Sequence, residues 1–164
     1  IQLGLVNSGG DGEGLQVGLV NVAANYDGVA VGLVTVHQQG YNHVFINAGS
    51  LDPIVLSGTW GSKYLYTHVQ LGRGKGFAAS GSTAIGLGLH VPMRKFYLDG
   101  DLAGGYRFGR NGDVLARARL QTGWSPKGRF GMQMGLVLET GPNSSFGRAN
   151  EWFDIVGFTA GLRF

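Results

Sequence analysis

Apolar and polar residues alternate with a period of two along the second half of this chain, and this pattern limits the fold more than any other feature. It runs through residues 96–108, 113–124, 128–140 and 151–164. In the third of these segments the even positions are all apolar from Phe130 to Leu138. Because successive side chains of a β-strand point to opposite faces, each segment is predicted to be a strand with one apolar and one polar face.

Glycine interrupts every stretch that is long enough to form a helix. The chain of 164 residues contains 31 glycines, far above the usual share of about 7%. Clusters of Gly, Asn, Asp and Pro separate the candidate strands, at residues 1–7, 14–22, 28–36, 41–48, 54–60, 64–72, 81–92, 96–108, 113–124, 128–140 and 151–164. Parallel strands need long crossover connections, whereas antiparallel strands need only a short turn. We therefore expect an all-β antiparallel meander, with residues 1–164 forming a single domain.

Two folds satisfy this pattern, a soluble β-sandwich and a transmembrane β-barrel. Aromatic residues lie at strand ends on the apolar face, where a membrane barrel carries its interfacial girdles. They are Trp60, Phe96, Phe108, Trp124, Phe130, Trp152 and Phe164. Charged residues make up only 14% of the chain, which is low for a surface in contact with water. We favour a closed antiparallel transmembrane β-barrel of about 10–12 strands with short loops, since bacterial barrels of this type have even strand numbers.

Glycines on the polar face of the predicted strands support the barrel. They are Gly86, Gly88, Gly105, Gly123, Gly131, Gly135, Gly157 and Gly161. A face in contact with water gains nothing from glycine, but a crowded or strongly curved concave face does. The even-numbered residues from Phe96 to Phe164 are then expected to face lipid.

The segment "FTAGLRF" ends on an aromatic residue, Phe164. This strand resembles the C-terminal signature of bacterial outer-membrane β-barrel proteins. The resemblance implies a location in the bacterial outer membrane. It also implies that the barrel assembly machinery reads Phe164 as an assembly signal.

The first 36 residues contain three repeats of about 14 residues, written "IQLGLVN", "GLQVGLVNVA" and "GVAVGLVTV". Gly4, Gly18 and Gly32 hold equal positions in them. The repeats fit either a parallel β-solenoid or antiparallel hairpins about Asp11 and Asn25 that continue into the barrel. We favour the hairpins. The motif "GLxVGLVNVA" resembles repeats of uncharacterised bacterial surface proteins, and this resemblance implies no activity.

Charged residues on the polar face form the most informative cluster, because all of them are predicted to point into the lumen. They are Asp99, Asp101, Arg107, Arg117, Arg119, Arg129, Glu139 and Arg163. One interpretation is that they pair and fill a narrow barrel, since unpaired buried charges are costly. The other is a narrow polar pore with a cationic bias. We favour the filled barrel.

The remaining residues give little evidence of chemistry. The chain has no cysteine and no metal-ligand spacing among its histidines, so we expect no metal and no cofactor. Ser82 and His90 share a face of one strand, but eight residues of strand span about 26 Å, too far for a nucleophile and its base. No catalytic residue is therefore assigned, and no dense basic run points to nucleic acid. Four cations near predicted outer loops are candidates for contact with lipopolysaccharide phosphates: Arg73, Lys75, Arg110 and Arg148.

Three classes of function follow from these expectations. The first is a non-enzymatic integral outer-membrane barrel. It is either a structural or partner-binding component or a narrow pore, and its expected partners are outer-membrane lipids and other envelope proteins. The second is an outer-membrane enzyme that modifies lipids, such as an acyl hydrolase or transferase. The third is a soluble β-barrel or solenoid that binds an apolar ligand. We favour the first class.

Overall fold

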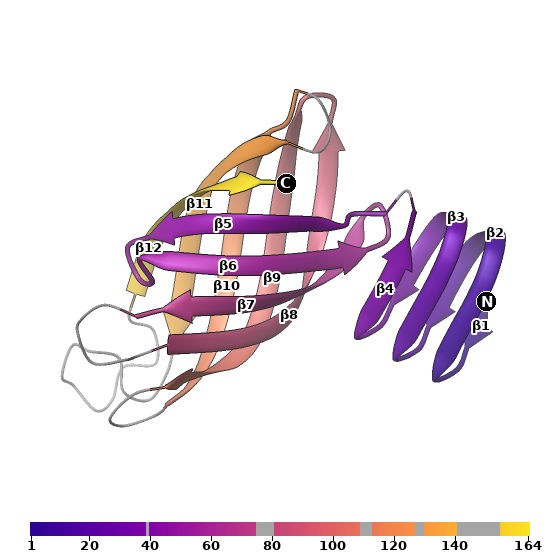
Figure 1. The fold of residues 1–164 in the computed structure, drawn as a ribbon, viewed down its shortest axis with the longest axis horizontal. Helices are drawn as coiled ribbons and strands as arrows, with labels where there is room; N and C mark the ends of the chain where they lie inside the picture. The colour runs from indigo at the N-terminus through magenta and orange to yellow at the C-terminus, as the bar shows by residue number, and fades with distance from the viewer. Residues whose placement is uncertain (39, 75–80, 109–112, 127–129, 141–154) are drawn as a thin grey trace.

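The computed structural model describes residues 1–38, 40–74, 81–108, 113–126, 130–140 and 155–164, and within these ranges it contains only strands, turns and connecting segments. Two sheets are present, a closed barrel and a four-stranded parallel sheet beside it (Figure 1). Among the described residues, no helix is long and apolar enough to cross a membrane.

The barrel consists of eight antiparallel strands, each paired with the next one along the chain. They are β5 (His43–Gly49), β6 (Ile54–Gly61), β7 (Leu65–Arg73), β8 (Gly81–Met93), β9 (Phe96–Phe108), β10 (Asp113–Trp124), β11 (Gly131–Thr140) and β12 (Ile155–Arg163). The ring closes where β12 pairs with β5, from Thr159 opposite Gly49 to Arg163 opposite Phe45. Short turns at residues 62–64 and 94–95 mark one end of the barrel, which we call the turn end. The opposite end, which carries residues 50–53, is the loop end.

The structure confirms an all-β fold with a closed antiparallel barrel. The expected number of about 10–12 strands is wrong, because the ring holds eight. The candidate segments from residue 41 onward supply these eight strands, and the three earlier segments lie outside the ring. Eight inclined strands are enough to close a barrel whose interior is filled by side chains.

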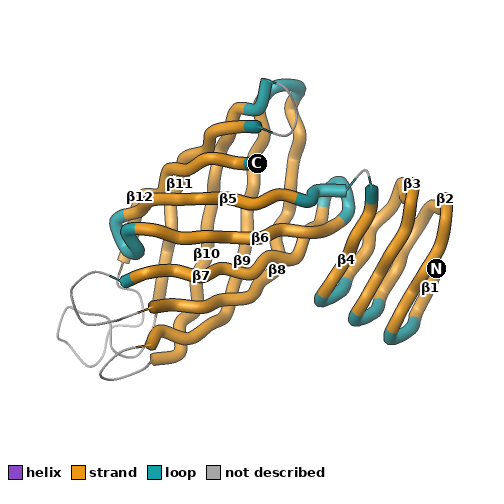
Figure 2. The backbone as a smooth tube through the Cα atoms, in the orientation of Figure 1, coloured by secondary structure: helices purple, strands orange, loops and turns teal. Residues whose placement is uncertain are grey.

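The repeats form the second sheet, whose strands are β1 (Gln2–Leu3), β2 (Val6–Val17), β3 (Val20–Val31) and β4 (Val34–His37). All pairs in this sheet are parallel, with each residue beside the one 14 positions further on, as Val6 is beside Val20. The long strands β2 and β3 bend back within their length, so the chain winds as a narrow coil (Figure 2). We call this coil, residues 2–37, the repeat stack.

The interpretation of the repeats as antiparallel hairpins is wrong, and the solenoid alternative is right. Both arrangements bring Gly4 close to Gly18, so this pair does not distinguish them. They differ at Asn7, which a hairpin about residue 11 would place opposite Leu15. In the structure Asn7 Nδ2 instead donates a hydrogen bond of 2.8 Å to Asn21 Oδ1. A parallel stack thus lets equal polar side chains of successive repeats satisfy one another, which the hairpin does not.

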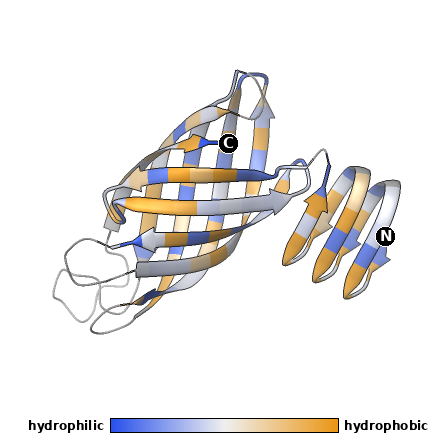
Figure 3. Ribbon diagram, viewed as in Figure 1, coloured by the Kyte–Doolittle hydropathy of each residue, from blue (hydrophilic) through white to orange (hydrophobic). Residues whose placement is uncertain are grey.

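Both sheets bury polar residues and expose apolar ones. Hydrophilic and hydrophobic residues alternate along their strands (Figure 3). Along the barrel, the described even-numbered apolar side chains from Phe96 to Phe164 point away from the lumen, as the alternation predicts. Five of the most exposed are Leu102, Val114, Met134, Val156 and Phe158. The buried side chains of the lumen are mostly polar or charged. The barrel therefore has the inverted polarity that a lipid environment requires.

Two of the lumen glycines make room for tyrosine rings that lie across the barrel. A Cβ atom added to Gly88 would lie 2.2 Å from Tyr66 Cζ, and one added to Gly123 would lie 2.0 Å from Tyr97 Cζ. Both distances are far below van der Waals contact, so no larger residue fits while the rings keep their places. The glycines of the polar face thus mark a crowded lumen, as the sequence predicts.

Candidate functional site: the charged lumen

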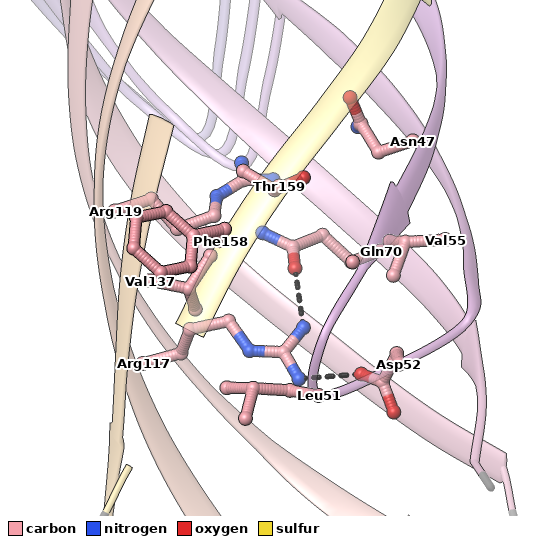
Figure 4. Close-up of a pocket in the computed structure, with 11 residues that line it drawn as sticks. Asn47, Leu51, Asp52, Val55, Gln70, Arg117, Arg119, Val137, Phe158 and Thr159 are labelled. Carbon is pink, nitrogen blue, oxygen red and sulfur yellow. Dashed lines mark hydrogen bonds and ion pairs between the residues drawn. The ribbon is translucent and has the colours of Figure 1, made fainter. Parts of the chain in front are cut away.

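Arg117 on β10 is the centre of a buried cluster near the loop end of the lumen (Figure 4). Its Nη2 atom donates to Asp52 Oδ2 over 2.6 Å and to Glu139 Oε2 over 2.5 Å. Its Nε atom donates to the same Glu139 oxygen over 3.0 Å, and its Nη1 atom donates to Gln70 Oε1 over 3.0 Å. One guanidinium thus connects β7, β10, β11 and the turn after β5 across the interior.

Asp52 links this cluster to two further side chains. Ser82 Oγ donates to Asp52 Oδ2 over 3.1 Å, and Arg107 Nη2 lies 4.0 Å from Asp52 Oδ1. Arg107 also forms an ion pair with Glu139 Oε1. Asp52 is almost completely buried although it belongs to the turn between β5 and β6. The turn therefore folds a carboxylate inward, where it shares two arginines with Glu139.

A second ion pair, between the neighbouring strands β9 and β10, lies on the lumen wall. Arg119 Nε donates to Asp101 Oδ1 over 2.9 Å, and Arg119 Nη2 donates to Asp101 Oδ2 over 2.8 Å. Tyr66 OH adds a hydrogen bond of 3.2 Å to Asp101 Oδ2, and His68 Nε2 lies 3.7 Å from Asp101 Oδ1. Asp101 and Arg119 are direct partners in the register of β9 and β10. Two parallel hydrogen bonds fix this geometry more firmly than a single contact does.

The turn end of the lumen is filled by aromatic rings around Asp99. Tyr41 OH donates to Asp99 Oδ2 over 2.6 Å, and His90 Nδ1 lies 2.6 Å from Asp99 Oδ1. The rings of Tyr41 and His90 stack with centroids 4.0 Å apart. Arg163 lies over the Tyr97 ring, with its Cζ atom 4.3 Å from the centroid. Tyr41 precedes β5, so the segment that leads into the barrel also helps to fill its mouth.

Little free space lies beside the loop-end cluster. A cavity of about 20 Å³ touches Asn47, Gln70, Arg117 and Thr159. This volume holds roughly one water molecule. Asn47 Nδ2 and Gln70 Nε2 have no hydrogen-bond partner within the described protein, so the cavity offers polar atoms to such a water. A hydrated ion is too large for it.

Charge is balanced among the described residues of the lumen. The arginines are Arg107, Arg117, Arg119 and Arg163, and the carboxylates are Asp52, Asp99, Asp101 and Glu139. The excess of arginine that the sequence suggested is absent here for two reasons. Asp52 adds an acid, and Arg129 lies outside the described residues. The cationic bias that favoured a pore is therefore lost from this part of the lumen.

The other predicted site residues lie at the two ends of the barrel or outside the described residues. Arg73 ends β7 at the loop end and is exposed. Lys75, Arg110 and Arg148 fall outside the described residues. Phe164 is at the turn end, where its backbone N–H donates to Val44 O over 2.9 Å and its carbonyl accepts from Val44 N over 3.1 Å.

Sequence reasoning missed three kinds of lumen residue. Asp52 lies outside the predicted strands, so no alternation places it. Tyr41 begins the predicted strand 41–48 and Tyr66 belongs to β7, and the alternation of these strands could have shown that both point inward. The uncharged Gln133 accepts from Tyr97 OH over 3.2 Å and donates to Asn47 Oδ1 over 2.7 Å. A search restricted to charges leaves out such amides.

Among the described lumen residues, no serine hydroxyl is hydrogen-bonded to a histidine ring. Ser82 bonds to Asp52 near the loop end, whereas His90 bonds to Asp99 near the turn end. Both residues lie on β8, and eight residues of strand separate them by about 26 Å. The described geometry therefore supplies no nucleophile with an adjacent base.

A comparison of the sequence with protein-family models finds no match, and neither does a comparison with curated proteins. Solved structures do match. The N-terminal β-barrel domain of OprF from Pseudomonas aeruginosa is 14% identical with a TM-score of 0.50, over 75% of this chain and 96% of that one. Neisserial surface protein A is 12% identical with a TM-score of 0.43, over 74% and 92%. A de novo designed transmembrane β-barrel is 14% identical with a TM-score of 0.44, over 75% and 91%.

The likeness to the OprF domain concerns the fold. Together with the closed ring and its apolar outer wall, it identifies the fold of residues 43–163 as that of a transmembrane β-barrel.

Proposed function

We propose that this chain is a non-enzymatic integral protein of the bacterial outer membrane, whose barrel is a closed structural anchor and not a pore. The observation that carries the proposal is the network around Arg117, which joins Asp52, Glu139 and Gln70 across the lumen. The apolar outer wall and the likeness to the OprF barrel domain support the membrane setting.

The network opposes ion flow because its charges are buried and paired. Removing one partner of a buried ion pair typically costs roughly 3–5 kcal/mol, since the other charge is left without compensation. An ion that entered would have to displace Arg117 from its carboxylates. The free space beside Arg117 is about 20 Å³, so an ion could not keep its hydration shell there. The interior thus supports rigidity and not transport.

Planar-bilayer recording tests this proposal. The wild-type protein is expected to conduct little, and the double variant Arg117→Ala with Arg119→Ala is expected to conduct more, because it removes two side chains that block the lumen. Arg73→Ala, an exposed cation at the end of β7, is the matched control and should behave like wild type. A large and stable wild-type conductance would instead support the narrow pore.

A further inference from the structure

The repeat stack has a polar interior, which is unusual for so small a unit. Asn21 Nδ2 donates to Thr35 Oγ1 over 3.3 Å, which extends the ladder from Asn7 through the coil. Gln16 Nε2 donates to Gln2 Oε1 over 2.6 Å in a second ladder. A soluble solenoid of this size would gain stability from an apolar core. This stack instead exposes most of its leucines and most of its valines.

The outer leucines gather along one edge of the stack. Leu5, Leu19 and Leu33 hold equal positions in the repeats and are 73%, 55% and 50% exposed. We call residues 4–6, 18–20 and 32–34 the leucine edge. It carries only Gly, Leu and Val, and Figure 3 shows it as a hydrophobic border of the coil.

Backbone groups of the leucine edge are hydrogen-bonded within the stack. Val17 O accepts from Gly4 N over 3.1 Å and from Asn7 Nδ2 over 2.9 Å. Leu19 O accepts from Val34 N over 2.9 Å. Water is not needed to satisfy these groups. Such internal satisfaction is a requirement for a backbone that lies in hydrocarbon.

The leucine edge is continuous with the outer wall of the barrel. Trp60 Nε1 donates to Leu33 O over 2.8 Å, and Thr67 Oγ1 donates to Gly32 O over 2.5 Å. Trp60 and Thr67 are register partners near the turn end. Thr67 shares its face of β7 with the outward Leu71 but is buried beneath the stack. The apolar wall of the barrel thus passes directly into the apolar edge of the stack.

The opposite edge of the stack is polar and lies closer to the turn end of the barrel. Glu13 and Asp27 hold equal positions there and are exposed. The pKa of the Lys63 ammonium is raised, chiefly by the hydrogen bond to Tyr64 and in small part by the charge of Asp27. Lys63 belongs to the turn between β6 and β7, beyond the Trp60–Thr67 pair. Asp27 is therefore close to Lys63 in the turn, whereas the leucine edge contacts the Trp60–Thr67 pair.

We propose that the leucine edge inserts into the membrane beside the barrel, with phospholipid acyl chains as its partner. This inference rests on the proposed membrane role of the barrel. The edge meets the wall at the level of Trp60, a residue type that marks the interface between headgroups and acyl chains. The stack then lies in this interface with its leucines toward the hydrocarbon and its carboxylates toward water. It widens the apolar footprint of the protein on one leaflet.

Lipid quenching of single labels tests the insertion. The chain contains no cysteine, so Leu19→Cys, Leu33→Cys, Leu102→Cys and Glu13→Cys each accept one bimane label. The full-length variants are reconstituted into vesicles of phosphatidylethanolamine and phosphatidylglycerol, with and without brominated acyl chains. Interfacial elements bury their apolar face about 5–10 Å deep, so quenching at Leu19 and Leu33 should be within about a factor of two of that at Leu102. The label at Glu13 should be quenched much less.

The control positions separate the possible outcomes. If the label at Leu102 is quenched but the labels at Leu19 and Leu33 are quenched as little as the one at Glu13, the insertion is overturned and the barrel proposal is left intact. No quenching at Leu102 would overturn the membrane role itself. Quenching at Leu19 that falls as protein density rises would assign the edge to a second copy of the chain. Leu33 contacts the barrel through its backbone carbonyl, so its label still reports on the edge if the Leu19 variant disturbs the coil, which circular dichroism checks.

Discussion

The barrel and the repeat stack share their polarity but not their construction. Both bury polar side chains and expose apolar ones. The barrel does so with antiparallel neighbours, and its inward charges come from segments far apart in the sequence, as Arg117 on β10 and Asp52 in the turn after β5 do. The stack does so with parallel neighbours whose inward amides come from equal positions of adjacent repeats, as Asn7 and Asn21 do. Inverted polarity therefore requires internal hydrogen bonding but does not dictate the direction of the strands.

The largest expected effect concerns an ion pair of the barrel. Asp101→Ala leaves the buried Arg119 without its carboxylate, and we expect a loss of roughly 3–5 kcal/mol in the free energy of unfolding. Denaturant titration of the protein in lipid vesicles measures this loss. The double variant Asp101→Ala with Arg119→Met removes both charges and should recover most of the stability. A double variant as unstable as the single one would show that the pair itself, and not the unpaired charge, determines the cost.

The next effect concerns the outer wall of the barrel. Met134 is 64% exposed on β11, and Met134→Arg should cost roughly 2–4 kcal/mol because it places a charge in the hydrocarbon. Folding into vesicles, followed by gel mobility of the unheated protein, measures the yield. Met134→Leu is the matched control and should fold normally. Equal yields of the arginine and leucine variants would contradict the assignment of this face to lipid.

A smaller and local effect is expected in the stack. Asn21→Ala removes the hydrogen bonds to Val31 O and Thr35 Oγ1 and the bond that Asn7 Nδ2 donates to Asn21 Oδ1, although Asn7 Nδ2 keeps its bond to Val17 O. We expect a cost of roughly 1–3 kcal/mol. Hydrogen exchange should quicken in residues 6–37 and stay unchanged in the barrel. Val22→Ala, which shortens an exposed neighbour, should change neither region. Faster exchange throughout the barrel in the Asn21 variant would show that the two regions unfold as one unit.

The smallest effect on stability is expected at the turn end. Phe164→Ala removes a half-exposed ring that packs edge-on against Phe130, with centroids 5.7 Å apart, and keeps both backbone bonds to Val44. Refolded protein should lose about 1 kcal/mol or less. If assembly machinery reads this aromatic ring, the amount inserted in cells should fall much further than the stability does. Parallel small losses in both measurements would make Phe164 a packing residue alone.

How much the sequence predicted depends on whether an interaction is local. The alternation places Met134 and Gln133 on opposite faces because a strand has a fixed period of two, and the structure agrees. It does not choose between parallel and antiparallel neighbours for the repeats, since both bring Gly4 close to Gly18. The choice comes from the amide of Asn7, which finds an acceptor only in the stack.

The lumen residues also differ in how far the sequence predicts them, depending on whether they lie on strands or in turns. Asp101 and Arg119 lie on the polar faces of neighbouring predicted strands, so the alternation places both in the lumen. The observed register places them opposite each other. Asp52 enters the lumen from a turn, whose path follows from tertiary packing and has no periodic signal. The polar residues of the repeats do not predict an outer leucine edge, because the sequence does not say whether the repeats pair as parallel or antiparallel strands.

The pairing of β12 with β5 sets an order in time for the formation of the molecule. One edge of β5 has no partner until β12 arrives, because Gly49 pairs with Thr159 and all other barrel strands lie between them. Each coil of the stack needs only the coil 14 residues away, and contacts so close in sequence form fast, whereas distant ones form slowly. The stack is thus complete while β5 still presents open N–H and C=O groups. Until β12 pairs with it, β5 can pair with an incorrect strand.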